Sequence, residues 1–312
     1  MKIVFMGTPD FAVGALQAII DAGHEIAAVV TQPDKPKGRG KEMQFTPVKQ
    51  CAVAANIPVF QPVKVKTEEA VETLRAYQAD IFVVAAFGQI LSKEILEMPR
   101  FGCVNIHASL LPKYRGAAPI QWAIIDGEQE TGVTIMQMDV GIDNGDMLIK
   151  KVVPIAKSET GESLHDKLMQ AGAELIVEAL PRIEAGEVTP VKQSEEDSCY
   201  AKMLTKSLGH IDWSTTAVSI ERLIRGLNSW PSAFTYLNGK TLKIWKAEVV
   251  FQETKEPVGV ITDITKDSFT VNTGDGQLKV LDVQLEGKKR MRVHDFLLGN
   301  QITIGYRLGE KE

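Results

Sequence analysis

The chain has 312 residues, of which 44% are hydrophobic and 24% charged, which excludes a disordered or fibrous protein and suits two globular domains better than one. Its formal net charge of −5 at pH 7 excludes a molecule that binds nucleic acid through an overall basic surface. From Lys206 onward, however, 15 Lys and Arg stand against 13 Asp and Glu, so an anionic partner is permitted there.

Through the first half of the chain, short apolar runs rich in β-branched residues alternate with segments of helical periodicity. Strands are expected at residues 2–6, 25–31, 81–86, 103–106 and 131–136, and helices at residues 11–22, 46–55 and 67–77. This alternation predicts an α/β fold, a Rossmann-like doubly wound parallel sheet with helices on both faces, in which 103–106 and 131–136 are central parallel strands. The turn after the first strand, residues 7–11, lacks the G-x-G-x-x-G spacing, which argues against nicotinamide or flavin binding.

A polar and irregular stretch, residues 188–207, predicts a linker between an N-terminal domain of residues 1–187 and a C-terminal domain of residues 208–312. In the second domain one helix is expected at residues 219–227, followed by strands at 233–237, 242–250, 259–264, 268–273 and 277–284. Asn238-Gly239 and Asp275-Gly276 are strong hairpin signals. Five short strands in roughly 100 residues predict a smaller, OB-like β-barrel.

The cysteine, apolar and histidine patterns each argue against a class of protein. Cys51, Cys103 and Cys199 are far apart and odd in number, which disfavours a disulfide framework or a zinc site and favours the reducing cytoplasm. The longest apolar runs are far shorter than the ~20 residues of a membrane span, and the N-terminus lacks the features of a signal peptide, so no membrane partner is expected. The five histidines are scattered and form no H-E-x-x-H motif, so no metal is expected.

The residues that carry chemistry lie between Asn105 and Met147. Asn105 and His107 end a predicted strand two positions apart, so both side chains project to the same side. An amide donor beside an imidazole can stabilise an oxyanion while the imidazole moves protons, although a strand-end histidine can equally be structural. Residues 109–119 are dense in proline, glycine and small residues, which indicates a binding surface, and residues 138–147 place three aspartates among two glycines directly after a strand.

These motifs together resemble the folate-dependent formyltransferase family, which includes enzymes that act on glycinamide ribonucleotide and on methionyl-tRNA. The resemblance is carried by Asn105-Ile106-His107, by Ser109-Leu110-Leu111-Pro112 and by Asp143. Three further stretches resemble the methionyl-tRNA branch: the turn at residues 7–12, the loop at 31–41 and the central block at 115–121 and 130–139. Tail motifs at residues 211–213 and 243–247 extend the similarity over nearly the whole chain.

The resemblance implies catalytic roles for Asn105, His107 and Asp143 in formyl transfer. The donor would be 10-formyltetrahydrofolate, used without a metal, and the acceptor the α-amine of initiator methionyl-tRNA, giving N-formylmethionyl-tRNA for translation initiation by a monomeric enzyme. Ser109, Leu110, Leu111 and Pro112 would line the folate site, with the backbone of Phe87, Gly88, Ile90, Val140 and Gly141 helping to hold the pterin.

Two roles for His107 stay open at this point. Asn105 and a protonated His107 could both donate to the oxyanion of the tetrahedral intermediate, or His107 could move a proton from the amine to N10 of the folate through a water. Asp143 would set the tautomer of the imidazole. Free α-amines have pKa values near ~8, so the nucleophile needs no strong base.

The loop at residues 31–41 holds four cations, Lys35, Lys37, Arg39 and Lys41. Composition alone favours a solvated loop, but the resemblance implies that Arg39, with Lys37 and Lys41, contacts the acceptor end of tRNA. Lys206 is expected to contribute near the linker, and the C-terminal domain to supply mainly phosphate contacts. The run from Lys206 to His210 is less basic than the family pattern, which puts the linker's contribution in doubt.

Two alternatives compete with this interpretation. A sister enzyme that formylates a small amine, such as an amino-sugar nucleotide, would share the catalytic and folate residues and differ in the loop at residues 35–41 and in the central block, both of which favour tRNA here. A non-catalytic RNA-binding protein built on a barrel would leave the catalytic constellation unexplained, and the net charge disfavours it.

Overall fold

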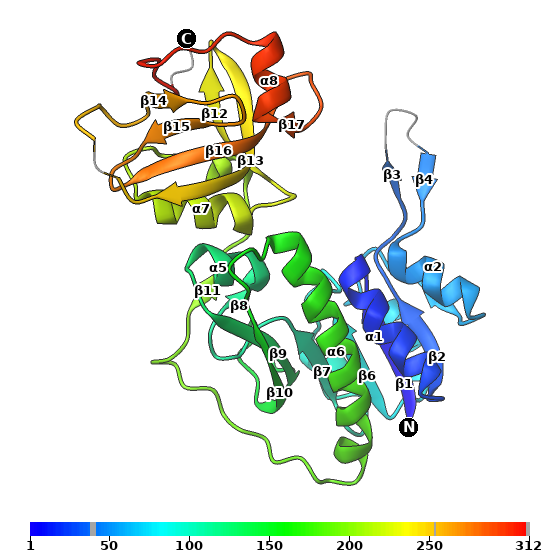
Figure 1. The fold of residues 1–312 in the computed structure, drawn as a ribbon. Helices are drawn as coiled ribbons and strands as arrows, with labels where there is room; N and C mark the ends of the chain where they lie inside the picture. Colours follow the sequence, from blue (N-terminus) through cyan, green and yellow to red (C-terminus); the bar gives the residue numbers. More distant parts are fainter. Residues whose placement is uncertain (38–41, 253, 310–312) are drawn as a thin grey trace. The chain divides into compact units, whose positions relative to one another are not determined.

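A computed structural model describes residues 1–37, 42–252 and 254–309 and divides the chain into two compact units (Figure 1). The N-terminal unit comprises Met1–Pro119, Glu130–Pro154 and His165–Ala201. The C-terminal unit comprises Ile120–Gln129, Ile155–Leu164 and Lys202–Glu312. No helix in the described part of the chain has the length and apolar character needed to cross a lipid bilayer.

The N-terminal unit is built on a seven-stranded sheet with the order β10-β9-β7-β6-β1-β2-β5. The strands are β1 (Lys2–Gly7), β2 (Glu25–Val30), β5 (Val59–Phe60), β6 (Ile81–Ala85), β7 (Cys103–His107), β9 (Glu130–Gln137) and β10 (Met147–Pro154). Strands β1, β2, β5, β6 and β7 pair in parallel, which confirms a sheet dominated by parallel strands.

The prediction that residues 131–136 form a parallel strand is wrong. β9 pairs antiparallel with β7 on one side and with β10 on the other. Val133, Ile135 and Met136 are nonetheless buried, as predicted from the apolar run. Such a run reports that a strand is covered on both faces, and it carries no information on the direction in which the strand runs.

Helices cover both faces of this sheet. α1 (Asp10–Asp21) and α6 (Gly161–Glu184) lie along one face (Figure 1), where Gly172 of α6 comes so close to Ile106 and Val133 that a side chain would crowd them. The other face packs against α3 (Glu68–Ala76) and α4 (Lys93–Leu96) through one buried apolar cluster. α2 (Pro47–Ala54) packs beside α1 and begins at the Thr46 cap, whose hydroxyl accepts the Lys49 N–H.

Short strands complete the N-terminal unit. β3 (Lys35–Lys37) and β4 (Glu42–Gln44) form a hairpin at the predicted cationic loop. β8 (Arg115–Gly116) pairs in parallel with β11 (Tyr200–Ala201). The extended segment that ends in β11, residues 191–201, is called the strap below.

The C-terminal unit contains an antiparallel sheet with the order β12-β13-β16-β15-β14, and β17 beside β16. Its elements are α5 (Pro119–Ile125), a 3₁₀ turn η1 (Lys206–Gly209), α7 (Ala217–Gly226), β12 (Ala233–Leu237), β13 (Lys240–Val250), β14 (Ile261–Ile264), β15 (Phe269–Asn272), β16 (Gln277–Leu285), β17 (Met291–Arg292) and α8 (Val293–Gly299). All five predicted strands and both predicted hairpins are confirmed. Among the described residues the pairings form an open path, so closure into an OB-like barrel stays a prediction.

Candidate active site

β7 presents two residues of the predicted catalytic trio on one face of the sheet. Ile106 lies against Gly172 of α6, whereas Cys103 belongs to the cluster that packs against α3 and α4. Because side chains alternate along a strand, Asn105 and His107 lie on the same face as Cys103. β7 is paired on both sides, with β6 and β9, so its backbone is a firm support for the two side chains.

Asp143 reaches Asn105 and His107 from the loop of residues 138–146, between β9 and β10. Its Oδ1 accepts from Asn105 Nδ2 at 3.4 Å, and its Oδ2 accepts from the Gly116 N–H at 2.8 Å and lies 3.6 Å from His107 Nδ1. The backbone of Asp143 is left-handed, with φ +49°, which costs a non-glycine residue about 1 kcal/mol. The structure thus brings the three predicted catalytic residues together, with Asn105 and His107 both beside the Asp143 carboxylate.

The imidazole of His107 faces an oxygen on each side. Nε2 lies 2.8 Å from the carbonyl oxygen of Tyr114, and Nδ1 faces the Asp143 carboxylate. A carbonyl and a carboxylate only accept, so the ring satisfies both contacts when both nitrogens carry protons. In that form a positive charge lies beside the amide of Asn105, an arrangement suited to stabilising a negative oxygen that develops during acyl transfer.

The loop after β7, residues 109–113, is held by a set of hydrogen bonds. The buried hydroxyl of Ser109 donates to Lys113 O at 2.6 Å. Thr134 Oγ1 donates to Ser109 O at 2.7 Å and accepts from Leu111 N at 3.2 Å, and Lys150 Nζ donates to Leu111 O at 2.5 Å. Burial lowers the pKa of Lys150. The Ser109 hydroxyl is therefore engaged in fixing the shape of the loop.

The loop after β6 is fixed through the carbonyl of Phe87. That oxygen accepts from Thr8 Oγ1 at 2.9 Å and from Gln32 Nε2 at 3.3 Å. Ala86 is left-handed, with φ +46°, so the chain turns sharply as it leaves the strand. The opening turn of the chain thus supports the segment expected to hold the pterin.

The predicted folate-binding residues differ in exposure. Phe87, Ser109 and Leu111 are buried, Leu110 and Pro112 are half-buried, and Gly88, Ile90, Val140 and Gly141 are exposed. Ile90, Val140 and the neighbouring Ile142 have 61–64% of their surface exposed. Aliphatic side chains this exposed, on loops beside a polar site, are typical of a surface that receives a partly apolar ligand.

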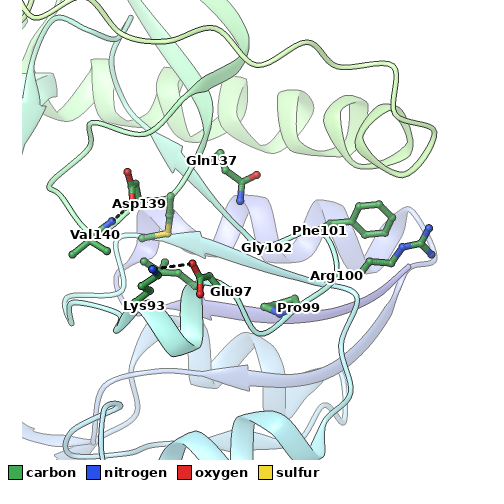
Figure 2. Close-up of a pocket in the computed structure, with 11 residues that line it drawn as sticks. Lys93, Glu97, Pro99, Arg100, Phe101, Gly102, Gln137, Asp139 and Val140 are labelled. Carbon is green, nitrogen blue, oxygen red and sulfur yellow. Dashed lines mark hydrogen bonds and ion pairs between the residues drawn. The ribbon is translucent and has the colours of Figure 1, made fainter.

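A pocket of about 650 Å³ lies beside the loop of residues 138–146 (Figure 2). Lys93 of α4 and Glu97, which follows α4, line it together with Asp139 and Val140 of that loop, and Lys93 Nζ lies 3.6 Å from Glu97 Oε1. Its lining, within the described chain, includes Val140 but none of the three predicted catalytic residues. The pocket therefore borders the predicted folate surface and is separate from the polar cluster itself.

The predicted tRNA contacts are placed only in part. Lys37 ends β3, whereas Arg39 and Lys41 lie outside the described residues. At the base of the hairpin, Lys49 pairs with Asp34, and this hydrogen bond lowers the pKa of Asp34. Lys206 is exposed at the start of η1, in the C-terminal unit.

Sequence reasoning missed the residues of the strap that contact the site. Gln193 Nε2 donates to the carbonyl oxygens of Asp143 and Gly145, both at 2.8 Å. The buried Arg115 binds Gln193 and Glu195. No local sequence pattern predicts contacts between residues that are 48–80 positions apart. The available signal was Arg115, a charged residue inside a loop rich in small and apolar residues.

Comparison with known proteins assigns the chain to a family. Residues 1–180 match the family described as formyl transferase, and residues 203–301 match the formyl transferase C-terminal domain. The chain is 57% identical to a methionyl-tRNA formyltransferase of Agathobacter rectalis (98% of each chain covered) and 57% identical to one of Lachnospira eligens (99% and 100%). It is 51% identical to one of Clostridioides difficile (99% and 100%).

The chain belongs to the methionyl-tRNA formyltransferase family. The resemblance inferred from the sequence motifs is thereby confirmed, and the chain is a formyl-transferring enzyme. Solved structures at lower identity share the fold. An N-formyltransferase of Helicobacter canadensis, in complex with folinic acid and dTDP-3-aminofucose, has a TM-score of 0.67 at 20% identity and covers 93% of this chain and 100% of its own. HypX of Aquifex aeolicus, in complex with tetrahydrofolic acid, has a TM-score of 0.62 at 18% identity, covering 98% and 51%.

Proposed function

We propose that this member of the methionyl-tRNA formyltransferase family transfers the formyl group of 10-formyltetrahydrofolate to the α-amine of initiator methionyl-tRNA. The observation that carries the proposal is the convergence of Asn105, His107 and Asp143 in a chain whose relatives of that name are 51–57% identical to it over nearly its whole length. The product is N-formylmethionyl-tRNA for translation initiation, made in the cytoplasm by a monomer that needs no metal.

The reaction is an acyl transfer in which the amine attacks the formyl carbon. The new C–N bond forms as the carbonyl π electrons move to oxygen, and collapse of the tetrahedral intermediate breaks the bond to N10, which takes up one proton as the attacking amine loses one. Asn105 Nδ2, which has a second N–H besides the one that meets Asp143, is the donor placed to stabilise the negative oxygen, and loss of one such donor typically costs about 100-fold in rate. The N–H groups of a protonated His107 face Tyr114 O and Asp143, so His107 contributes its positive charge. Asp143 holds both side chains, because its carboxylate meets the Asn105 amide and faces His107 Nδ1.

The folate is proposed to bind across the loops that follow β6, β7 and β9. Ile90, Val140 and Ile142 offer exposed aliphatic surface, and the backbone of Gly88 and Gly141 is accessible beside them. The loop of residues 109–113 would form the remaining wall, with Leu110 and Pro112 as its half-buried side chains. Neighbours with the same fold that were solved with a bound folate support a folate as the ligand.

The tRNA is proposed to meet both domains. Residues 1–187 carry folate binding and catalysis, residues 188–207 connect, and residues 208–312 form an OB-like barrel that contacts phosphates. Arg39, with Lys37 and Lys41, acts at the acceptor end, and Lys206 adds a contact near the connection.

The deciding assay measures formyl transfer from 10-formyltetrahydrofolate to three acceptors: charged initiator tRNA, uncharged tRNA and an amino-sugar nucleotide. Transfer to charged tRNA alone is expected, and transfer to the small amine alone would overturn the assigned acceptor. His107→Ala and Asp143→Ala should each lower kcat far more than they raise KM, whereas Asp146→Asn in the same loop should stay close to wild type. Near-normal turnover in His107→Ala or Asp143→Ala removes that residue from the mechanism.

The tRNA assignment has its own test. Arg39→Ala should raise KM for charged tRNA or lower kcat on it, while leaving the affinity for 5-formyltetrahydrofolate unchanged. Lys66→Ala, an exposed cation of the same unit outside the proposed contact, is the matched control. An equal loss of folate affinity in Arg39→Ala would refute the role at the acceptor end.

A further inference from the structure

The strap, residues 191–201, contacts the site along its length. Val191 pairs with Met147, at the start of β10, through two backbone hydrogen bonds of 2.8 and 2.9 Å. The carbonyl of Cys199 accepts from Arg115 N, and that of Ala201 accepts from Ala117 N, both at 2.9 Å. The strap therefore binds the start of β10, directly after the loop of residues 138–146, and the segment around β8.

Gln193 lies where these two segments meet, and its side-chain amide is used at both ends. Nε2 donates to Asp143 O and to Gly145 O, each at 2.8 Å, and Oε1 accepts from Arg115 Nε at 2.9 Å. A left-handed aspartate persists only where its surroundings hold it. One bond from Gln193 thus acts on the backbone of Asp143 itself, and the other acts on the backbone two residues further along the same loop.

Arg115 links the strap to β8, the strand whose Gly116 contacts the Asp143 carboxylate. Its side chain is 1% exposed, and Nη1 and Nη2 both bind the Glu195 carboxylate at 3.0–3.1 Å. The next residue, Gly116, donates its N–H to Asp143 Oδ2. With φ +105° and only 2.9 Å between a hypothetical Cβ and Ala201 O, this position accommodates glycine alone.

We propose that Gln193 is a positioning residue for formyl transfer, which orients the catalytic Asp143 through its backbone while the Gly116 N–H orients its carboxylate and Arg115 binds the Gln193 side chain. The strap is thereby a working part of the active site, although its residues lie about 50 positions after Asp143 in the chain. The inference rests on the proposed function, because it takes Asp143 as catalytic.

A role limited to fold stability would act differently. The acceptors of the Gln193 amide are two carbonyls of a surface loop, and Gln193 itself is only half-buried. Loss of the two bonds frees the loop of residues 138–146 and leaves the sheet intact. The chemical step should therefore suffer while the binding of substrates and the global unfolding change little.

The test compares Gln193→Glu and Gln193→Ala with Glu196→Ala, an exposed strap residue outside this network. Gln193→Glu keeps an acceptor for Arg115 Nε, removes the donor to the two carbonyls and adds a negative charge beside them, whereas Gln193→Ala removes the amide without adding a charge. Both Gln193 variants should lower kcat about tenfold or more, with KM for folate and for charged tRNA within about threefold of wild type. Glu196→Ala should behave as wild type, and the melting temperature should be similar in all three.

A double-mutant cycle separates positioning from general damage. In an Asp143→Ala background, Gln193→Glu should cause less than about a twofold further loss, because it acts through a side chain already removed. A full, independent loss in that background would overturn the proposal, as would wild-type kcat in both Gln193 single variants. Near-normal turnover in Asp143→Ala would instead overturn the catalytic assignment, so the two failures are distinguishable. If Gln193→Ala fails to fold, Gln193→Glu decides alone, and a misfolded Gln193→Glu would also count against the proposal.

Discussion

Thr134 on β9 tests whether the loop of residues 109–113 is held by hydrogen bonding to the sheet. Its fully buried hydroxyl donates to Ser109 O and accepts from Leu111 N. Thr134→Val keeps the shape of the side chain and leaves both backbone groups unpaired. Each unpaired buried group costs about 1–3 kcal/mol, and the added methyl returns about 0.8 kcal/mol. We therefore expect a net loss of roughly 1–5 kcal/mol in the free energy of unfolding.

The same strand offers a matched control in Thr131. Its buried hydroxyl has no hydrogen-bond partner among the residues that the structure describes. Thr131→Val thus removes an unpaired polar group and leaves none behind, so the free energy of unfolding should stay the same or rise. The same substitution, Thr to Val, is therefore expected to lower the free energy of unfolding at position 134 and not to lower it at position 131.

Urea unfolding followed by far-UV circular dichroism measures both variants by linear extrapolation. Tryptophan fluorescence is the wrong probe, because Trp122, Trp213, Trp230 and Trp245 all belong to the C-terminal unit. Thr134→Val should also raise KM for 10-formyltetrahydrofolate, since its loop loses two anchors. Equal stability of Thr134→Val and Thr131→Val would refute the reasoning.

Three further predictions concern other parts of the site. Asn105→Ala should lower the single-turnover rate of formyl transfer about 100-fold with little change in folate affinity, because an oxyanion donor is lost. Desolvation lowers the pKa of Lys150 in the folded state below its ordinary value of 10.5, so folding disfavours the charged amine. The free energy of unfolding of wild type should therefore rise relative to that of Lys150→Met as the pH increases from the folded pKa towards 10.5. Urea titrations of both proteins at several pH values measure this difference. The Arg115 guanidinium lowers the pKa of Glu195, so the stabilisation that the Arg115–Glu195 pair gives the folded state is present above about pH 4.5 and is lost as the pH falls through the folded pKa. Amide hydrogen exchange of residues 114–118 should therefore be slower in wild type than in Glu195→Gln at pH 6, and this difference should vanish in acid.

Periodicity accounts for the part of the fold that the sequence predicted. The strands predicted at residues 2–6 and 81–86 are buried on both faces over residues 3–6 and 81–85, as their apolar runs indicate. The hairpin at Asn238-Gly239 was predictable because this dipeptide tolerates the positive φ that a tight turn needs. Asn105 and His107 were found by their two-residue spacing on a strand, which guarantees a shared face.

The remainder of the site depends on contacts that leave no local trace. The direction of β9 is set by its pairing with β7 and β10, and residues 131–136 would look the same in either direction. The strap looked like a linker because its residues are polar, yet those polar groups bind the carbonyls and the guanidinium of distant loops. A polar stretch between two domains is read as solvated unless its partners are known.

The catalytic side chains are supported in two ways, by the sheet and by loop contacts, and substitutions that weaken each support should have different effects. Asn105 and His107 sit on a strand paired on both sides, so their positions are as stable as the sheet, and changes beneath the loop at Thr134 should appear in the unfolding free energy. Asp143 sits on a left-handed loop position, held by Gln193 and Gly116. Because those contacts contribute little to the core, their loss should appear in kcat first. A variant of Gln193 with wild-type turnover and reduced stability would show that this division is wrong.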